Sequence, residues 1–162
     1  MALALEIIIG IAAFSAIVIP MVLKNPLDAL GDYPPAIRER CQELGLIAPR
    51  ENRFTTADLV RKGIAMIVLA LVLAFALKRF NGASTFIQGF TTSYIIWLAI
   101  TWWDAFVLDC GLFCHWKAYR IPGTEDMIDA YHDYGFHIRQ SCIGTALGLP
   151  ACALVGLLVV VL

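Results

Sequence analysis

The sequence predicts an all-α integral membrane protein, and three observations lead to this fold class. First, 60% of the 162 residues are hydrophobic and the mean hydropathy is +0.76, whereas soluble domains are typically about 45–50% apolar. Second, the apolar residues gather in four long runs with almost no charge, which is typical of transmembrane helices. Third, the charged residues gather between these runs. We therefore expect one membrane domain, built as a four-helix bundle in a cell membrane.

The four spans follow from the limits of the apolar runs. We expect the first at about residues 7–23 and the second at about 63–77, a short run whose flanking Lys and Arg side chains can reach the interface. The third is expected at about 86–107, ending in tryptophans that suit the interfacial aromatic belt. The fourth is expected at about 138–162. Two larger loops, 24–62 and 108–137, then lie on one side of the membrane.

The distribution of Lys and Arg predicts the orientation. Loop 24–62 carries seven of these residues and the segment from span three to the start of span four carries three: Lys24, Arg38, Arg40, Arg50, Arg53, Arg61 and Lys62, then Lys117, Arg120 and Arg139. The opposite side has only Lys78 and Arg79. By the positive-inside rule, both larger loops are cytoplasmic and both termini lie outside. The cysteines of these loops are then in a reducing compartment, and no disulfide framework is expected.

Both cytoplasmic loops contain a predicted helix. In the first loop, a short amphipathic helix begins at the prolines 34–35, places Ile37, Cys41 and Leu44 on one face, and ends at Gly45. It is expected at the interface or over the mouth of the bundle.

In the second loop, Thr124 is a candidate N-cap with two acids in the following turn. No proline interrupts this helix before Pro150, so we expect a cytoplasmic extension that continues into span four. One face of it would carry Asp126, Asp129, Asp133, His137 and Ser141.

Span three is predicted to extend beyond the membrane in the same direction. From Phe86 to His115 it would be about 45 Å long, against a hydrocarbon core of about 30 Å. With α-helical spacing, one of its faces carries Ser93, Trp97, Thr101, Asp104, Leu108, Gly111 and His115. Spans three and four are antiparallel, so their polar ends emerge together on the cytoplasmic side.

A candidate site follows from this convergence. All three histidines and six of the thirteen acids lie between residues 104 and 137, and ionisable groups at membrane depth are costly and usually functional. The candidate catalytic residues are Asp104, Asp109, His115, Asp133 and His137. A carboxylate beside a histidine suits general acid–base chemistry.

Basic residues near this site predict the kind of substrate. Guanidinium and ammonium groups bind phosphate or carboxylate, and the candidates are Lys117, Arg120, Arg139, Arg38 and Arg40. Together with the acids and histidines they suggest a lipid headgroup or another amphipathic substrate, and membrane lipids are the expected partners.

The chemistry leaves alternatives open. A divalent metal held by His115, Asp133 and His137 is one, since histidine and carboxylate suit Zn²⁺, Fe²⁺ or Mn²⁺, although no established metal motif is present. Proton or ion translocation is another, but no complete charged pathway crosses the spans. A third is a non-catalytic subunit or scaffold whose charged cytoplasmic helix binds a partner protein. The net charge of −1 gives no support for a nucleic-acid partner.

Span four also carries a ridge of small residues, one every four positions: Gly144, Gly148, Cys152 and Gly156. Such ridges let helix backbones approach closely in lipid. Two interpretations follow, a homo-oligomer that meets through this ridge, or packing against another span of the same chain.

Overall fold

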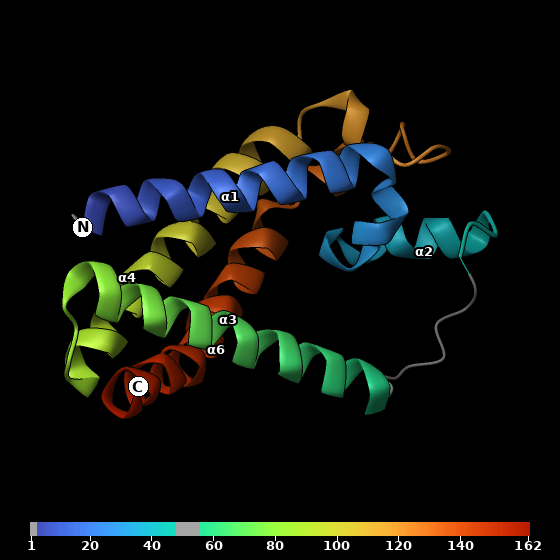
Figure 1. The fold of residues 1–162 in the computed structure, drawn as a ribbon. Helices are drawn as coiled ribbons and strands as arrows, with labels where there is room; N and C mark the ends of the chain where they lie inside the picture. Colours follow the sequence, from blue (N-terminus) through green and yellow to red (C-terminus); the bar gives the residue numbers. More distant parts are fainter. Residues whose placement is uncertain (1–2, 48–55) are drawn as a thin grey trace. The chain divides into compact units, whose positions relative to one another are not determined.

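The computed structural model describes residues 3–47 and 56–162, and every regular element in them is a helix (Figure 1). The all-α prediction is confirmed. The elements in chain order are α1 (Leu3–Lys24), η1 (Pro26–Asp32), α2 (Pro35–Glu43), α3 (Thr56–Asn81), α4 (Phe86–Trp103), η2 (Asp104–Phe113), η3 (Lys117–Tyr119), α5 (Ile128–Tyr131) and α6 (Tyr134–Val161). The segments η1 and η3 are 3₁₀ turns, whereas η2 is a π-helix that continues α4 without a break.

Four segments are long and apolar enough to cross a membrane: Leu3–Lys24, Val60–Asn81, Phe86–Phe113 and Ile128–Val161. Their number and order agree with the sequence prediction, and each extends beyond the predicted limits at one or both ends. Many large apolar side chains on α1 and α3 are more than half exposed, among them Ile8, Ile17, Leu69 and Phe75. Such side chains suit hydrocarbon as their solvent, so the helices are consistent with a multi-pass membrane protein. Arg50 and Arg53, which contribute to the predicted orientation, lie outside the described residues.

The chain forms two compact units. The first unit comprises Met1–Gly10, Asn52–Ala99 and Gly144–Leu162, and the second comprises Ile11–Glu51 and Ile100–Ile143. In the first unit, α3 and the connection after it pack on the C-terminal part of α6 through small and branched side chains: Ala70, Ala74, Leu77, Ala83, Val155 and Val159. The Lys78 ammonium donates a hydrogen bond to the carbonyl oxygen of Val159 at 3.0 Å. It thereby satisfies one of the carbonyls that the end of α6 leaves without a helical partner.

The small-residue ridge of α6 faces α4 within this unit. A Cβ atom on Gly156 would lie 2.9 Å from the carbonyl oxygen of Phe86, and one on Gly148 would overlap the Trp97 indole. The indole nitrogen of Trp97 donates to the carbonyl oxygen of Gly144 at 3.0 Å. These contacts support the second interpretation of the ridge, close packing inside one chain.

The second unit is organised around three buried tyrosines. The Tyr33 hydroxyl donates to the carbonyl oxygen of Tyr119 at 2.7 Å, and the rings of Tyr33 and Tyr131 meet edge to face. The Tyr131 hydroxyl accepts the Ile121 N–H at 2.9 Å and lies 2.6 Å from the Thr124 hydroxyl. Thr124 therefore holds this tyrosine core together, and the prediction that it caps a helix is wrong.

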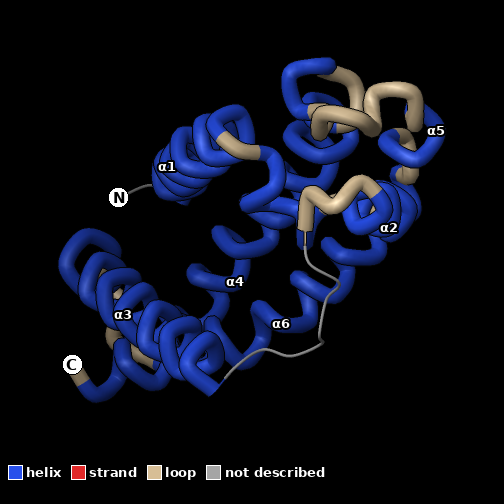
Figure 2. The backbone as a smooth tube through the Cα atoms, turned by 90° about the vertical axis from the view of Figure 1, so that its right-hand side faces the viewer, coloured by secondary structure: helices blue, strands red, loops and turns tan. Residues whose placement is uncertain are grey.

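The tyrosine core brings α2 beside α5 (Figure 2). On α2, Ile37 and Cys41 are fully buried in the core, while Leu44 is exposed. The helix has Pro35 in its first turn and is followed by Gly45 with φ +67°, the left-handed conformation that glycine adopts at helix ends.

The expected unbroken helix from Thr124 into span four is interrupted. α5 ends at Tyr131, and α6 begins at Tyr134 after a turn. The carboxylate of Asp133 accepts the N–H of Phe136 at 2.9 Å, as the N-cap residue of a new helix does. Because the turn breaks the α-helical register, the predicted single face from Asp126 to Ser141 is wrong.

Candidate functional site

The winding of η2 determines which side chains share a face at the end of span three. The Cys114 N–H donates to the carbonyl oxygen of Asp109, five residues earlier, at 3.0 Å, which is the π-helical pattern. In an α-helix, residues five apart point about 140° away from each other, whereas the wider turn closed by an i→i+5 bond brings them to the same side of the helix. Asp104 and Asp109 are five apart. The predicted α-helical stripe that continued from Asp104 to His115 is therefore wrong.

The centre of the site is a pair formed by Asp109 of η2 and His137 of α6. Their Oδ2 and Nδ1 atoms are 3.2 Å apart, and the side chains are only 15% and 7% exposed. A carboxylate at Nδ1 fixes the proton on that nitrogen and leaves Nε2 free to accept another. The pair thus has the geometry of an oriented general base.

Two further charged groups, Asp32 of η1 and Arg38 of α2, belong to the electrostatic surroundings of this pair. Asp32 is the last residue of η1, a turn that begins where the Asn25 side chain accepts the Leu27 N–H at 3.3 Å. Burial raises the pKa of Asp32, the charge of Asp109 raises it further, and the charges of His137 and Arg38 partly offset both. Charges at these positions therefore act on one another.

Asp104 belongs to the same group, since the charges of Asp109, Asp32 and His137 all act on its carboxyl. We call Asp32, Arg38, Asp104, Asp109 and His137 the acid–histidine cluster. The cluster holds three carboxyl groups against one guanidinium and one imidazole, so complete ionisation leaves an excess of negative charge. Such an arrangement favours uptake of a proton or binding of a group with positive charge or hydrogen-bond donors.

No protein-family model, curated protein or solved structure matches the chain. The chemistry of the acid–histidine cluster is therefore inferred from its own geometry.

The structure gives two of the predicted catalytic residues other neighbours. His115 Nε2 lies 3.1 Å from the Tyr134 hydroxyl, and its ring centroid is 4.7 Å from that of His132. We call these three residues the imidazole–tyrosine cluster. Asp133 caps α6, as described above. Of the five predicted residues, Asp109 and His137 are thus in contact, and Asp104 interacts electrostatically with both.

The hypothesis of a metal ion gains no geometric support. Among the residues that the structure describes, no three His, Cys, Asp or Glu side chains are grouped so that they could hold a metal ion. The proposed ligands His115, Asp133 and His137 are thus not assembled into a coordination site. His137 is paired with Asp109 instead.

The basic residues predicted to bind substrate are dispersed. Arg40 pairs with Glu43 at 3.2 Å. Arg120 donates to the carbonyl oxygen of Glu125 at 3.2 Å and lies over the Tyr131 ring. Lys117 and Arg139 are exposed. Only Arg38 joins the acid–histidine cluster, with its guanidinium also 6.0 Å from the centre of the Phe136 ring.

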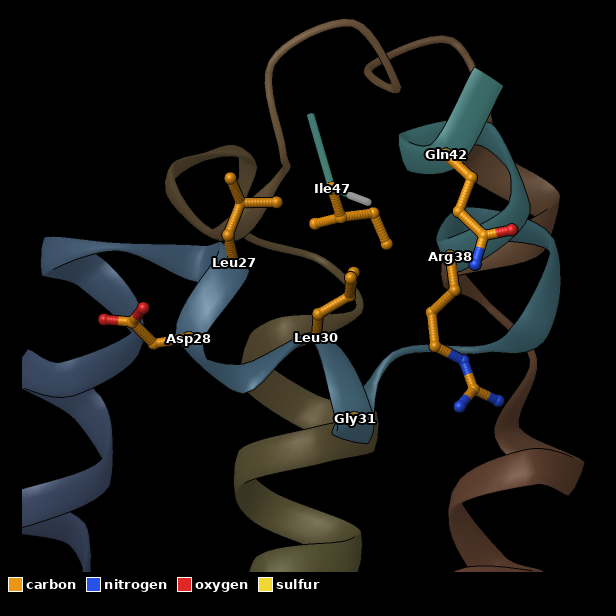
Figure 3. A pocket seen from close by; sticks show the side chains of 7 residues that line it. All are labelled: Leu27, Asp28, Leu30, Gly31, Arg38, Gln42 and Ile47. Carbon is orange, nitrogen blue, oxygen red and sulfur yellow. The ribbon is translucent and has the colours of Figure 1, made fainter. Parts of the chain in front are cut away.

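Arg38 also borders a cavity of about 250 Å³. Leu27, Leu30 and Ile47 form the apolar wall of the cavity and converge in Figure 3. Arg38 and Gln42 of α2 form the opposite, polar wall. The Arg38 side chain extends along α2, and its guanidinium lies at the edge of the cavity close to Gly31. One residue is thus shared by the cavity and the cluster.

The sequence reasoning missed Asp32. Its own neighbours in sequence show no periodic pattern. Its position in the sequence could have indicated it. Asp32 is an acid in the short segment between Pro26 and Pro34 that follows span one, where the chain turns back toward the end of the bundle.

Proposed function

We propose that this protein is a multi-pass membrane protein whose acid–histidine cluster binds a lipid or amphipathic substrate and performs acid–base chemistry on it at the cytoplasmic edge of the membrane. The buried pair of Asp109 and His137 carries the proposal. A carboxylate that orients an imidazole supplies a general base near neutral pH, and such groups are seldom buried at the end of a membrane span without a functional reason.

The charge of the cluster refines the substrate class. Because only one of the five predicted basic residues joins the cluster, an anionic group is poorly accommodated beside its three carboxyls. A hydroxyl or amine on the substrate head suits them better, since either can donate hydrogen bonds to carboxylates. The apolar part of the substrate would remain among the spans.

Lipid mass spectrometry of protein purified in mild detergent tests this proposal. We expect a co-purified amphiphile in the wild type and its loss in Asp109→Asn and His137→Gln. The matched control is Asp129→Asn, since Asp129 is an exposed acid on α5. Circular dichroism must show that all variants remain helical. Retention of the amphiphile in every variant, or its absence from the wild type, would favour the scaffold alternative.

The orientation is part of the proposal and has a separate test. Lys and Arg are in excess between the first and second membrane-crossing segments and around the connection between the third and fourth, which supports a cytoplasmic location for both connections. In a cysteine-free background, an impermeant thiol reagent applied to intact cells should label Ser84→Cys and not Glu125→Cys, both of which replace exposed residues. The reverse pattern would place the acid–histidine cluster on the outer side.

A further inference from the structure

The second unit also has a groove on the surface formed by η2 and α6. This open groove of about 410 Å³ is lined by Phe106, Cys110 and Gly111 of η2 and by Tyr134 and Ile138 of α6. Both walls belong to segments that can cross a membrane, Phe86–Phe113 and Ile128–Val161. In such a place the solvent is hydrocarbon, so an apolar groove is filled by an acyl chain rather than by water.

One end of this groove is polar. Tyr134 lines the groove, and its hydroxyl is 3.1 Å from Nε2 of His115. The His132 ring stacks on the Tyr134 ring with 5.9 Å between centroids. Two imidazoles and a phenol therefore gather at the place where the apolar lining ends, and all three groups can donate hydrogen bonds.

The residues after His115 indicate the depth of this polar end. Trp116 is 49% exposed, and exposed tryptophans near the ends of spans prefer the membrane–water interface. Lys117 follows it and is also exposed. Lipid phosphates lie at this level and attract lysine.

We infer that the groove binds one acyl chain of a phospholipid, whose phosphate is held by the imidazole–tyrosine cluster. The groove is a binding site separate from the acid–histidine cluster, and the inference does not require that cluster to be catalytic. It also assigns a role to His115, which the structure separates from the pair of Asp109 and His137.

Photocrosslinking tests the groove. The protein is reconstituted in phosphatidylcholine vesicles that contain a trace of a phospholipid with a diazirine in its acyl chain, and adducts are mapped by peptide mass spectrometry. We expect an adduct on the segment 106–111 that unlabelled phospholipid displaces. Cys110→Phe should fill the groove and reduce this adduct by on the order of tenfold. Val107→Phe is the matched control, because Val107 is exposed on η2 and does not line the groove.

A second variant guards against a folding defect in Cys110→Phe. Phe106 is 57% exposed, so Phe106→Ala removes one wall of the groove with little effect on the core, and it should also weaken the adduct. An adduct that unlabelled phospholipid fails to displace, or that is equal in Cys110→Phe and Val107→Phe, would mean ordinary boundary lipid and would overturn the inference.

Competition distinguishes the parts of the ligand. Phospholipid should displace the labelled lipid, whereas a fatty acid of the same chain length and inorganic phosphate should not. Combined substitution His115→Ala and His132→Ala should abolish the advantage of phospholipid over fatty acid. Equal competition by the fatty acid in the wild type would refute phosphate recognition. The adduct on the segment 106–111 and the amphiphile that co-purifies with the protein are separate readouts, so failure of the groove and failure of the proposed function give different results.

Discussion

Replacing Gly156 by alanine tests how closely α4 and α6 approach each other in the first unit. The added Cβ would lie 2.9 Å from the carbonyl oxygen of Phe86 and equally close to its ring. A ring can rotate, but the carbonyl belongs to the backbone of α4, so the helices must separate. Overpacking of this kind typically costs about 1–3 kcal/mol. The greater helix propensity of alanine offsets about 0.5–1 kcal/mol of it.

Gly63→Ala is the matched control, because a Cβ at this position of α3 meets no atom within 4 Å. It keeps the gain in propensity and lacks the packing cost. The free energies of unfolding of the two variants should therefore differ by about 1–3 kcal/mol, with Gly156→Ala the less stable. Equilibrium unfolding in mixed micelles, followed by tryptophan fluorescence, measures this difference.

Two results would contradict the reasoning. Equal stability of Gly156→Ala and Gly63→Ala would mean that α4 and α6 do not meet at Gly156. Loss of a dimer without loss of monomer stability, measured by crosslinking in bilayers, would show that the ridge is an interface between copies of the chain. The small-residue pattern alone could not separate these two cases, since it is the same for both.

Three further predictions concern the second unit. Asp109→Asn and His137→Gln should each lower the free energy of unfolding by about 1–3 kcal/mol, because each removes one partner of a buried hydrogen-bonded pair, and the double variant should lose less than the sum in a double-mutant cycle. Because the pKa of Asp32 is raised in the folded protein, the folded state binds more protons than the unfolded state between the ordinary and the raised pKa. Wild-type stability relative to Asp32→Asn should therefore fall as the pH rises through that window, and a rise would refute the assignment. Burial raises the pKa of Cys114 to about 12, so this thiol should resist maleimide at neutral pH until detergent unfolds the protein, as peptide mass spectrometry can measure.

The spans were predictable because their signal is local. Three apolar runs are long enough to cross a bilayer, the second run does so with its flanking Lys and Arg side chains, and charged residues mark the limits. The break at residues 132–133 was not, because neither Pro nor Gly stands there. The break depends on contacts between residues that are separated in sequence. Ile121 and Thr124 hold the Tyr131 hydroxyl, so the chain turns after Tyr131 before α6 begins.

The candidate site was predictable in the same limited way. The sequence indicates Asp104, Asp109 and His137 because ionisable residues at membrane depth are rare. Their partners depend on how η1 and α2 fold back, which no periodic pattern records, and so Asp32 was missed. His115 was assigned by α-helical spacing, and the π-helical winding of η2 invalidates that spacing. The change of winding has no marker in composition.

The π-helix itself strengthens the functional interpretation. Helices of this type are rare, are mostly single-turn bulges and occur frequently at functional sites, and here the winding extends over ten residues. It starts at Asp104, and a hydrogen bond from Cys114 to Asp109 closes its end. An ordinary α-helix would direct these two carboxyls to different sides of the span. The unfavourable winding and the unfavourable clustering of acids thus coincide at one place, beside His137. An apolar α-helix would provide packing at lower cost, so the coincidence of these two costly features supports the proposed acid–base role.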